Sequence, residues 1–324
     1  MTSLFGIIAH PVAHSLSPAM HNAAFKALKM DARFDAFDVL PEDLEKFMKE
    51  HRELKGMAVS IPHKETVGQY LDEIDPIARE IGAVNTVYSK GEKRCGTNTD
   101  APGFLRAVKE AMPELKGKRA VILGAGGAAR AVVWALTKEG MEVAILNRTG
   151  EKAEMLAKAF QAVKDPQIKV AKNWEEIGGK IDLIVNTTSV GLEGHEEPEL
   201  VPARYFHSNQ VVFDLVYQKK SITKLLVYAQ SAGAKIVDGK AMLLYQGMLQ
   251  FELWTGQKAP KEVMRTALKG LFFLQKRGPT HIFMCFFVFF NRGFFGFRNP
   301  AHIVAICRPA IEEIHAIPLI NPAV

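Results

Sequence analysis

A glycine-rich segment at residues 121–130 has the spacing of a dinucleotide-binding turn. It reads VILGAGGAAR, an apolar run followed by glycines and then by residues that favour a helix. A dinucleotide pyrophosphate needs free backbone N–H groups, the positive end of a helix dipole and no Cβ atoms in its way. Such a turn can also be purely structural, but its place between a strand and a helix favours a cofactor site. The residues of this predicted site are Gly124, Ala125, Gly126, Gly127 and Ala128.

The residues after the next predicted strand indicate which dinucleotide binds. NAD-binding domains usually place Asp or Glu about 20 residues beyond the first glycine, where it holds the ribose 2′-hydroxyl. Here Asn147, Arg148 and Thr149 stand in that region, no acid occurs at 145–149, and Lys152 follows. A guanidinium can bind a 2′-phosphate through two hydrogen bonds, whereas a carboxylate would repel it. Unless Arg148 is an ordinary surface residue, the pattern predicts NADP.

Four polar segments lie where loops are expected in the first hundred residues. They are residues 14–18, 60–64, 85–86 and 98–100. Ser15 and Ser17 stand two apart at a predicted helix start, so both could donate to one carboxylate. Lys64 follows a short strand, at the edge where α/β sheets usually carry active-site groups. Each residue also has a plainer explanation: Ser17 and Asp100 as helix caps, and Lys64 as a solvated surface cation.

Four histidines in this part of the chain raise the question of a metal site. They are His10, His14, His21 and His63. No HxH or HExxH spacing joins them, and no acid stands at a suitable interval. The sequence therefore predicts no metal.

Strand-like and helix-like segments alternate along the first hundred residues. Strands are predicted at 4–9, 33–39, 57–60 and 84–89, and helices at 18–29, 41–52, 64–70 and 76–81. This alternation is typical of an α/β sheet with crossover helices. Ser17 before Pro18 predicts a helix that Ser17 caps.

From residue 100 onward the alternation is more regular. Strands are predicted at 119–123, 142–146, 181–186, 211–214 and 235–237, and helices at 102–111, 128–138, 150–162 and 221–230. This order indicates a doubly wound nucleotide-binding domain. Two further helices, at 242–255 and 260–273, have no strands left to join, so we expect them to pack on the first domain or across the cleft.

Composition limits the class of protein. The chain has 324 residues, 48% of them apolar, and a formal net charge of +6, which suits two globular domains. It has no long Lys/Arg run, so we expect a small anionic ligand rather than nucleic acid. Three scattered cysteines predict a reducing, cytoplasmic location. The N-terminus reads as a strand rather than a signal peptide, and no apolar run is long enough to span a membrane.

Residues 277–324 differ in composition from all that precedes them. They hold eight of the twenty phenylalanines, with the run IFMCFFVFF at 282–290. Nine residues are too few to span about 30 Å of hydrocarbon as a helix. This tail is expected to lie outside the enzyme fold as an appendage; a surface anchor for a membrane or a partner is the alternative.

Taken together, the motifs resemble the shikimate dehydrogenase family in order and spacing. They are HSLSPAMHN, the Pro-x-Lys of residues 62–64, IGAVNT, NTDAPGF, GAGGAARA, NRT, NTTSVGL, FDLVY and GKAMLLYQG. The resemblance covers about residues 3–273. It implies a substrate domain of residues 1–100 and 238–276, an NADP-binding Rossmann domain of residues 101–237, and reversible NADPH-dependent reduction of 3-dehydroshikimate to shikimate on the route to chorismate and the aromatic amino acids.

The same resemblance implies a role for each site residue. Ser15 and Ser17 would hold the substrate carboxylate, with Tyr217 closing over it. Five residues would bind the ring hydroxyls: Ser60, Lys64, Asn85, Asp100 and Gln246. Lys64 and Asp100 would form the catalytic pair. The cofactor would meet Asn147, Arg148 and Thr149 at its phosphate end and Leu215 and Gly239 at its nicotinamide.

Some positions depart from the family pattern. Ala9, Ala58 and Ser60 replace the usual Gly, Asn and Thr, and Gln-Lys-Lys follows Tyr217 where Asn-Pro is common. These changes leave open a quinate/shikimate dehydrogenase with relaxed cofactor choice. A non-catalytic regulatory homologue is the other alternative, and a monomer and a homodimer are both compatible with the sequence.

Overall fold

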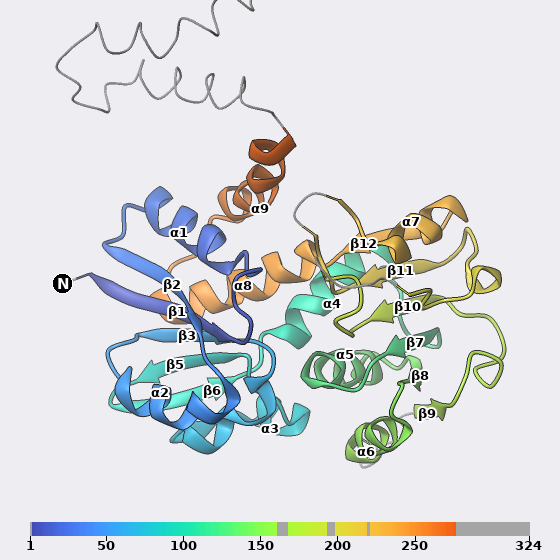
Figure 1. The fold of residues 1–324 in the computed structure, drawn as a ribbon, viewed down its shortest axis with the longest axis horizontal. Helices are drawn as coiled ribbons and strands as arrows, with labels where there is room; N and C mark the ends of the chain where they lie inside the picture. The colour runs from blue at the N-terminus through green and yellow to red at the C-terminus, as the bar shows by residue number, and fades with distance from the viewer. Residues whose placement is uncertain (1, 161–167, 193–197, 219–220, 277–324) are drawn as a thin grey trace, which may run out of the picture. The chain divides into compact units, whose positions relative to one another are not determined.

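The computed structural model describes residues 2–160, 168–192, 198–218 and 221–276, the last seven by their backbone alone. Residues Met1–Lys269 form one compact unit. It contains two six-stranded sheets, each joined to helices (Figure 1). The Phe-rich segment 282–290, the rest of the predicted tail and the last two residues of the predicted helix 150–162 lie outside the described residues.

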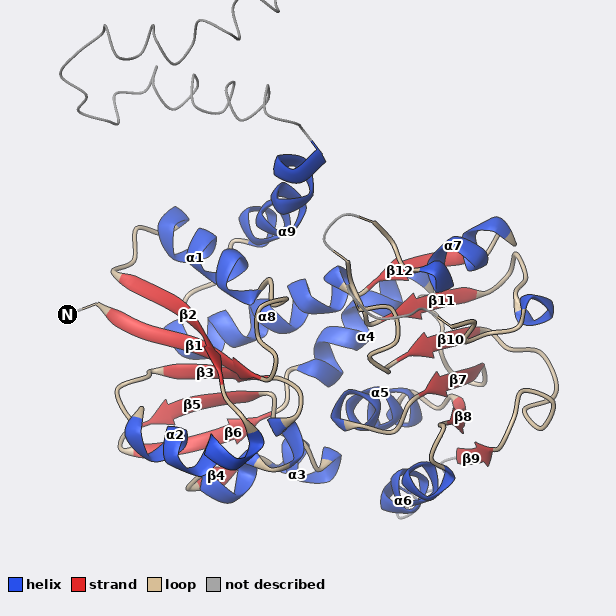
Figure 2. Ribbon diagram, viewed as in Figure 1, coloured by secondary structure: helices blue, strands red, loops and turns tan. Residues whose placement is uncertain are grey.

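The first sheet is mixed, with strand order β2-β1-β3-β5-β6-β4. Its strands are β1 (Ser3–Ala9), β2 (Ala32–Asp38), β3 (Gly56–Val59), β4 (Glu73–Ile74), β5 (Thr86–Lys90) and β6 (Lys93–Thr97). β1 runs parallel to β2 and β3, whereas β5 is antiparallel to both of its neighbours. The helices among these strands are α1 (Ser17–Ala27), α2 (Leu44–Glu50) and α3 (Pro76–Ile81) (Figure 2).

The second sheet is wholly parallel, with strand order β12-β11-β10-β7-β8-β9. Its strands are β7 (Arg119–Leu123), β8 (Glu142–Leu146), β9 (Ile168–Ala171), β10 (Leu183–Asn186), β11 (Val211–Asp214) and β12 (Lys235–Asp238). Helices α4 (Asp100–Ala111), α5 (Gly127–Lys138), α6 (Gly150–Phe160) and α7 (Lys224–Ser231) alternate with them. The strand order reverses between β7 and β10, which is the topology of a doubly wound fold. The predicted α/β fold class is confirmed.

Three strands were absent from the prediction, and one predicted helix is wrong. β4 has two residues, β6 carries Lys93 and Arg94, and β9 has four residues, so none of the three has a clear apolar alternation. Residues 64–70 form two short 3₁₀ segments, His63–Glu65 and Val67–Tyr70, instead of one α-helix. The backbone carbonyl of Lys64 accepts a hydrogen bond from Val84 N at 2.8 Å instead of one from a later residue of an α-helix.

The predicted cap of α1 is also wrong. Ser17 is already helical, and Leu16 is the N-cap residue, with no side-chain cap. Ser15 Oγ accepts a hydrogen bond from Ser17 N at 3.2 Å, so the hydroxyl two residues earlier serves the first free N–H group. Pro18 stands in the first turn, as predicted, because its missing N–H would have no helical partner there.

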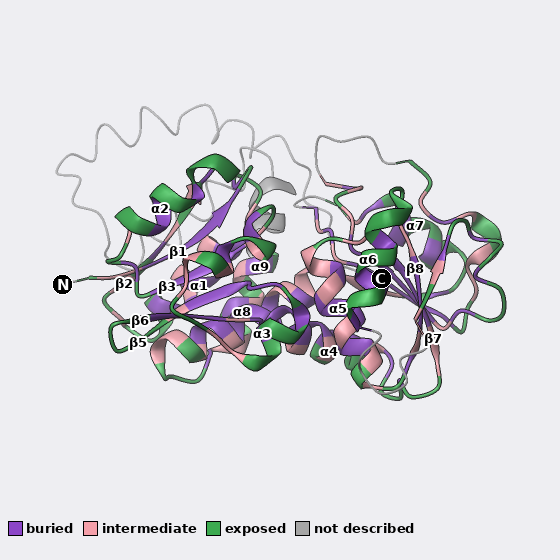
Figure 3. Cartoon of the chain, turned by 90° about the horizontal axis from the view of Figure 1, so that it is seen from below, coloured by how far each residue is buried: buried purple, intermediate pink, exposed green. Residues whose placement is uncertain are grey.

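Helix α8 (Lys240–Thr255) packs on the first sheet, although it follows the last strand of the second. Trp254 Nε1 donates to Val87 O on β5 at 2.9 Å, and its ring lies 5.6 Å from that of Phe5 on β1. Figure 3 shows β3, most of β1 and much of α8 as buried. A last helix, α9 (Lys261–Lys276), follows, with Met264 and Leu268 buried. The chain thus returns to its first sheet after forming the second.

Helices α4 and α8 approach closely at Gly103. A Cβ atom at this position would lie 2.7 Å from Gln246 N and 2.7 Å from Gln246 Cβ. Because the contact is with backbone, Gly103→Ala must push the helices apart. The clash outweighs the roughly 1 kcal/mol that alanine gains in helix propensity.

We expect Gly103→Ala to lower the free energy of unfolding in urea by about 1–3 kcal/mol. Gly150→Ala is the matched control, because a Cβ on this first residue of α6 would have no neighbour within 4 Å. Equal stability of the two variants would contradict close packing at Gly103.

Candidate active site

A cleft of about 430 Å³ lies among the loops that follow the strands of both sheets. A volume of this size suits a small molecule and part of a cofactor. All eight residues predicted to bind substrate line it: Ser15, Ser17, Ser60, Lys64, Asn85, Asp100, Tyr217 and Gln246. Three of the predicted cofactor residues line it as well: Ala128, Leu215 and Gly239.

Lys64 and Asp100 form an ion pair inside this cleft. Lys64 lies in the 3₁₀ turn after β3, and Asp100 begins α4. Lys64 Nζ donates to Asp100 Oδ2 at 2.6 Å, and the two side chains are only 14% and 6% exposed. A buried ammonium held by a carboxylate can donate a proton to an oxygen that becomes negative, and can stabilise that charge.

The amide of Asn85 has a fixed orientation. Its Oδ1 accepts hydrogen bonds from Thr99 N at 2.7 Å and from Thr86 Oγ1 at 2.8 Å. The amide therefore points its Nδ2 toward Thr99 Oγ1 and Gln246 Oε1, at 3.0 and 3.3 Å. Asn85 is buried and lines the cleft, so a ligand hydroxyl that accepts from Nδ2 would replace one of these two acceptors.

A further residue supports this arrangement from α8. Gln250 Nε2 donates to Asn85 O at 3.2 Å and to Thr86 Oγ1 at 3.0 Å. Thr86, Thr99 and Gln250 were not among the predicted site residues. Thr99 and Thr86 are adjacent in sequence to Asp100 and Asn85, whereas Gln250 gives no sequence signal other than its four-residue spacing from Gln246.

Tyr217 joins the loop after β11 to the loop before α1. Its hydroxyl has a hydrogen bond with the backbone of Leu16, next to Ser15 and Ser17. Burial raises the pKa of Tyr217 to about 12, although the hydrogen bond from Leu16 acts in the opposite direction. The phenol therefore stays protonated near neutral pH and can donate a hydrogen bond in the cleft.

The glycine-rich turn joins β7 to α5 and lies beside the ion pair. Gly124 has a φ of 111°, and a Cβ there would meet Thr187 Oγ1 at 2.6 Å, so this position requires glycine. A Cβ on Gly126 would have no neighbour within 4 Å, which leaves open space above the turn. A Cβ on Gly127 would lie 3.1 Å from Lys64 Cβ. The N-terminus of α5 thus adjoins Lys64, and its shape fits a dinucleotide pyrophosphate.

The predicted 2′-phosphate residues lie after β8, at the carboxyl edge that β8 shares with β7. Arg148 and Thr149 are exposed, and Asn147 Nδ2 donates to Thr149 O at 2.8 Å. These residues and the exposed Lys152 do not line the cleft itself. The structure therefore brings the predicted substrate residues into one cavity and places the predicted phosphate-binding residues apart from it.

The four histidines do not gather into a metal site. His63 contacts Val39 O at 2.8 Å, and His10 Nδ1 contacts Asp38 Oδ1 at 2.6 Å. His21 is fully buried against Phe34, and burial lowers its pKa to about 3. Among the residues described, no group of three or more His, Cys, Asp or Glu side chains could hold a metal ion. Nor does any described helix have the length and apolar character needed to cross a membrane.

Comparison with known proteins identifies the family. Models described as the shikimate dehydrogenase substrate binding domain, shikimate/quinate 5-dehydrogenase and the shikimate 5′-dehydrogenase C-terminal domain match residues 7–87, 106–215 and 241–269. A shikimate dehydrogenase (NADP(+)) of Methanopyrus kandleri is 48% identical over 276 residues, which are 82% of this chain and 95% of the relative. The chain belongs to the shikimate dehydrogenase family.

Solved structures of the shikimate dehydrogenase family have the same fold. The enzyme of Aquifex aeolicus is 42% identical, with a TM-score of 0.77 over 83% of this chain and 98% of that one. The enzyme of Thermus thermophilus, solved with NADP(H) and shikimate, is 40% identical, with a TM-score of 0.74 over 83% and 99%. A quinate dehydrogenase of Corynebacterium glutamicum, solved with NAD, has a TM-score of 0.74 at 28% identity over 83% and 99%.

Proposed function

We propose that this chain is an NADP-dependent shikimate dehydrogenase, which reduces 3-dehydroshikimate to shikimate reversibly on the route to chorismate and the aromatic amino acids. The observation that carries the proposal is the buried Lys64–Asp100 pair, 2.6 Å apart, beside the N-terminus of α5. A hydride donor bound on that helix would lie next to a proton donor, as the reduction of a ketone requires. The names of the relatives supply the substrate and the cofactor.

Reduction of the ketone adds a hydride to the carbonyl carbon and a proton to the carbonyl oxygen, and oxidation removes both. When bound, NADPH would supply the hydride for reduction, and NADP⁺ would accept it in oxidation. In the direction of reduction, the Lys64 ammonium donates a proton to the ketone oxygen as negative charge develops there. In the direction of oxidation, the Lys64 amine takes the hydroxyl proton. Asp100 holds Nζ of Lys64 in place and stabilises its ammonium form. It has this same role in reduction and in oxidation.

The proposed substrate contacts divide by chemistry. Ser15 and Ser17, near the N-terminus of α1, bind the carboxylate together with Tyr217. The ring hydroxyls are bound by Ser60, Lys64, Asn85, Asp100 and Gln246. The fixed amide of Asn85 supports this assignment, because its Oδ1 accepts from Thr99 N and its Nδ2 is a donor that can exchange Thr99 Oγ1 or Gln246 Oε1 for a ring hydroxyl.

Three groups of residues are proposed to contact the cofactor, one at the pyrophosphate and one at each end of the dinucleotide. Gly124, Ala125, Gly126, Gly127 and Ala128 hold the pyrophosphate. Asn147, Arg148, Thr149 and Lys152 hold the 2′-phosphate, and Leu215 and Gly239 contact the nicotinamide. The open space above Gly126 and the absence of an acid at 145–149 support this assignment.

We also propose that residues 1–100 and 238–276 act as the substrate domain and residues 101–237 as the NADP domain. The return of α8 to the first sheet supports this division. A cytoplasmic location is part of the proposal as well. Cys95, the one cysteine among the described residues, is buried and has a free thiol, which suits a reducing compartment.

A spectrophotometric assay tests the function. Initial rates of reduced-cofactor formation are measured with shikimate or quinate, each with NADP⁺ or NAD⁺. We expect the highest kcat/KM for shikimate with NADP⁺. Equal efficiency on quinate with NAD⁺ would favour a relaxed quinate/shikimate dehydrogenase, an alternative that Ser60 and the similarity to a quinate dehydrogenase keep open. No rate with any pair would point to a non-catalytic homologue.

A further inference from the structure

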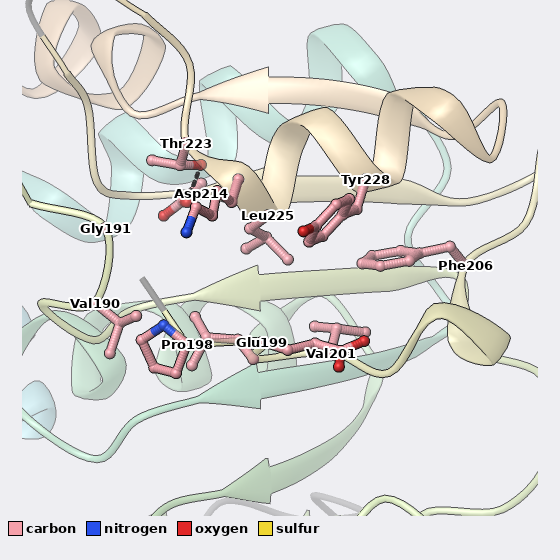
Figure 4. A pocket seen from close by; sticks show the side chains of 12 residues that line it. Val190, Gly191, Pro198, Glu199, Val201, Phe206, Asp214, Thr223, Leu225 and Tyr228 are labelled. Atoms are coloured by element: carbon pink, nitrogen blue, oxygen red, sulfur yellow. Dashed lines mark hydrogen bonds between the residues drawn. The ribbon is translucent and has the colours of Figure 1, made fainter. Parts of the chain in front are cut away.

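Asp214 is the most deeply buried carboxylate beside the cleft, and it has no place in the mechanism above. It ends β11 and is 0% exposed. Its Oδ1 accepts hydrogen bonds from Asn186 Nδ2 at 2.9 Å and from Val216 N at 3.0 Å. Its Oδ2 accepts one from Thr223 Oγ1 at 2.6 Å, drawn as a dashed line in Figure 4. One carboxylate thus joins three segments.

The first of these segments follows β10 and lines the cleft. Asn186 Nδ2 also donates to Val190 O at 3.2 Å, and its Oδ1 accepts from Thr188 N at 3.0 Å and Thr188 Oγ1 at 2.7 Å. Asn186 therefore holds the loop 187–192. Four residues of that loop face the cleft: Thr187, Thr188, Ser189 and Leu192.

The second segment follows β11 directly. The hydrogen bond from Val216 N fixes the turn that carries Leu215 and Tyr217, both of which line the cleft. A Cβ on Gly239 would lie 2.1 Å from Leu215 O, so the start of α8 packs directly on this turn. A shift of the turn would therefore reach Gly239 as well.

The third segment is the start of α7. Thr223 is the N-cap residue of α7, where its hydroxyl accepts from Leu226 N while it donates to Asp214. The small pocket beside it in Figure 4 has a volume of about 10 Å³, too small for a substrate. The geometry around Asp214 therefore serves internal contacts rather than a second ligand.

We propose that Asp214 is a positioning residue: its carboxylate anion fixes the loop 187–192 and the turn 215–217 against the cofactor side of the cleft, and turnover falls when that anion takes up a proton. This inference rests on the proposed function for the identity of the reaction. It adds a group that touches neither substrate nor cofactor and yet sets the rate.

The surroundings of Asp214 place the protonation of its carboxylate near neutral pH. Burial raises the pKa of Asp214 to about 7, whereas the hydrogen bonds from Thr223, Val216 and Asn186 act to lower it. The charge of Asp238, on the neighbouring β12, raises it further. Lys240 offsets part of that charge, since its Nζ lies 3.6 Å from Asp238 Oδ2. The other charged residues at this place are Lys224 and Glu199, which line the small pocket.

Protonation would disturb the site in a defined way. All three partners of the carboxylate donate, so an added hydrogen has no acceptor unless one partner turns. The hydroxyl of Thr223 is the partner that can rotate, and the bond from Thr223 to Oδ2 would be lost or reversed. The neutral carboxyl would also accept more weakly from Asn186 and Val216, because charge-assisted hydrogen bonds are about twice as strong.

The test compares the chain with its Asp214→Asn variant. Asparagine keeps the shape and the acceptor on Oδ1 and places N–H groups toward Thr223, so it imitates the protonated acid. We expect the ratio of the parent's kcat to that of the variant to be near 1 below pH 6 and to rise through about pH 7 to about tenfold at pH 8.5. Effects of Lys64 and of the cofactor phosphates are common to both proteins and cancel in the ratio.

A ratio that does not vary between pH 5.5 and 9 would overturn the inference, because a purely structural loss is the same at every pH. The Kd of NADPH, measured by the fluorescence of NADPH, gives the same comparison without turnover. The ratio of the parent's Kd to that of the variant is expected to change near the same pH. If the parent fails to oxidise shikimate, the proposed function falls, while the NADPH comparison still decides the role of Asp214.

Two substitutions at Thr223 provide the matched control. Thr223→Val removes the hydrogen bond that lowers the pKa of Asp214, so the midpoint of the parent's pH profile should rise by about one pH unit. Thr223→Ser keeps the hydroxyl and should leave the midpoint unchanged. Equal midpoints in the two variants would contradict the assignment of the pH profile to Asp214.

Discussion

Replacing Lys64 with alanine is expected to lower kcat for shikimate oxidation by about 100-fold or more, the usual loss when a general acid–base group is removed. The substitution deletes the proton carrier and the cation at the developing oxyanion, and it leaves Asp100 buried without its partner. The proposed dinucleotide contacts are with backbone and with other side chains, so the Kd of NADP⁺ should stay within about twofold. Steady-state kinetics and a fluorescence titration measure the two quantities.

Two further variants separate proton transfer from charge. Lys64→Arg keeps a cation but cannot release its proton near neutral pH, so its kcat should fall nearly as far. Lys55→Ala removes an exposed lysine just before β3, at the opposite end of the strand from Lys64, and should change neither quantity. A Lys64→Ala enzyme that turns over at the parent rate would remove Lys64 from the mechanism.

Replacing Arg148 with aspartate should shift the ratio of kcat/KM for NADP⁺ over NAD⁺ by about 100-fold or more in favour of NAD⁺. Two hydrogen bonds to the charged phosphate are lost, at about 1.5–3 kcal/mol each, and each 1.4 kcal/mol is about tenfold. The new carboxylate also repels the 2′-phosphate and can accept from the 2′-hydroxyl of NAD⁺. Initial rates with both cofactors at saturating shikimate give the ratio.

Lys116→Asp controls for the change in net charge. Lys116 is exposed and precedes β7, at the opposite edge of the same sheet from Arg148. Its replacement should leave the cofactor ratio unchanged. If the Arg148→Asp variant kept the parent's ratio, the 2′-phosphate would have to bind elsewhere.

The parts of the fold with a strong apolar period could be predicted from the sequence. The parallel strands around β7 are buried on both faces, so they appear as continuous apolar runs such as VIL at 121–123. The glycine-rich turn was predictable for a steric reason, since Gly124 has a φ that other residues rarely adopt. The strands that were missed, β4, β6 and β9, are short or carry charged residues, and their place depends on pairing rather than on pattern.

The site was predictable only in part, for a different reason. Each polar side chain had a plausible local explanation, and Ser17 shows how such explanations fail, because Ser15 serves its N–H group instead. Gln250 could not be found in the sequence, since its link to Asn85 joins residues 165 positions apart. Asp214 was hidden within an apolar strand, where its role depends on donors from β10 and from the residue before α7.

A crystal structure with shikimate and NADP⁺ bound tests the central claim most directly, through one distance. We predict that Lys64 Nζ lies about 2.6–3.2 Å from the oxygen on C3 of the ring. The nicotinamide carbon that exchanges hydride should lie about 3–3.5 Å from C3 itself. A ring whose C3 oxygen points away from Lys64, or a nicotinamide bound outside the cleft, would contradict the account.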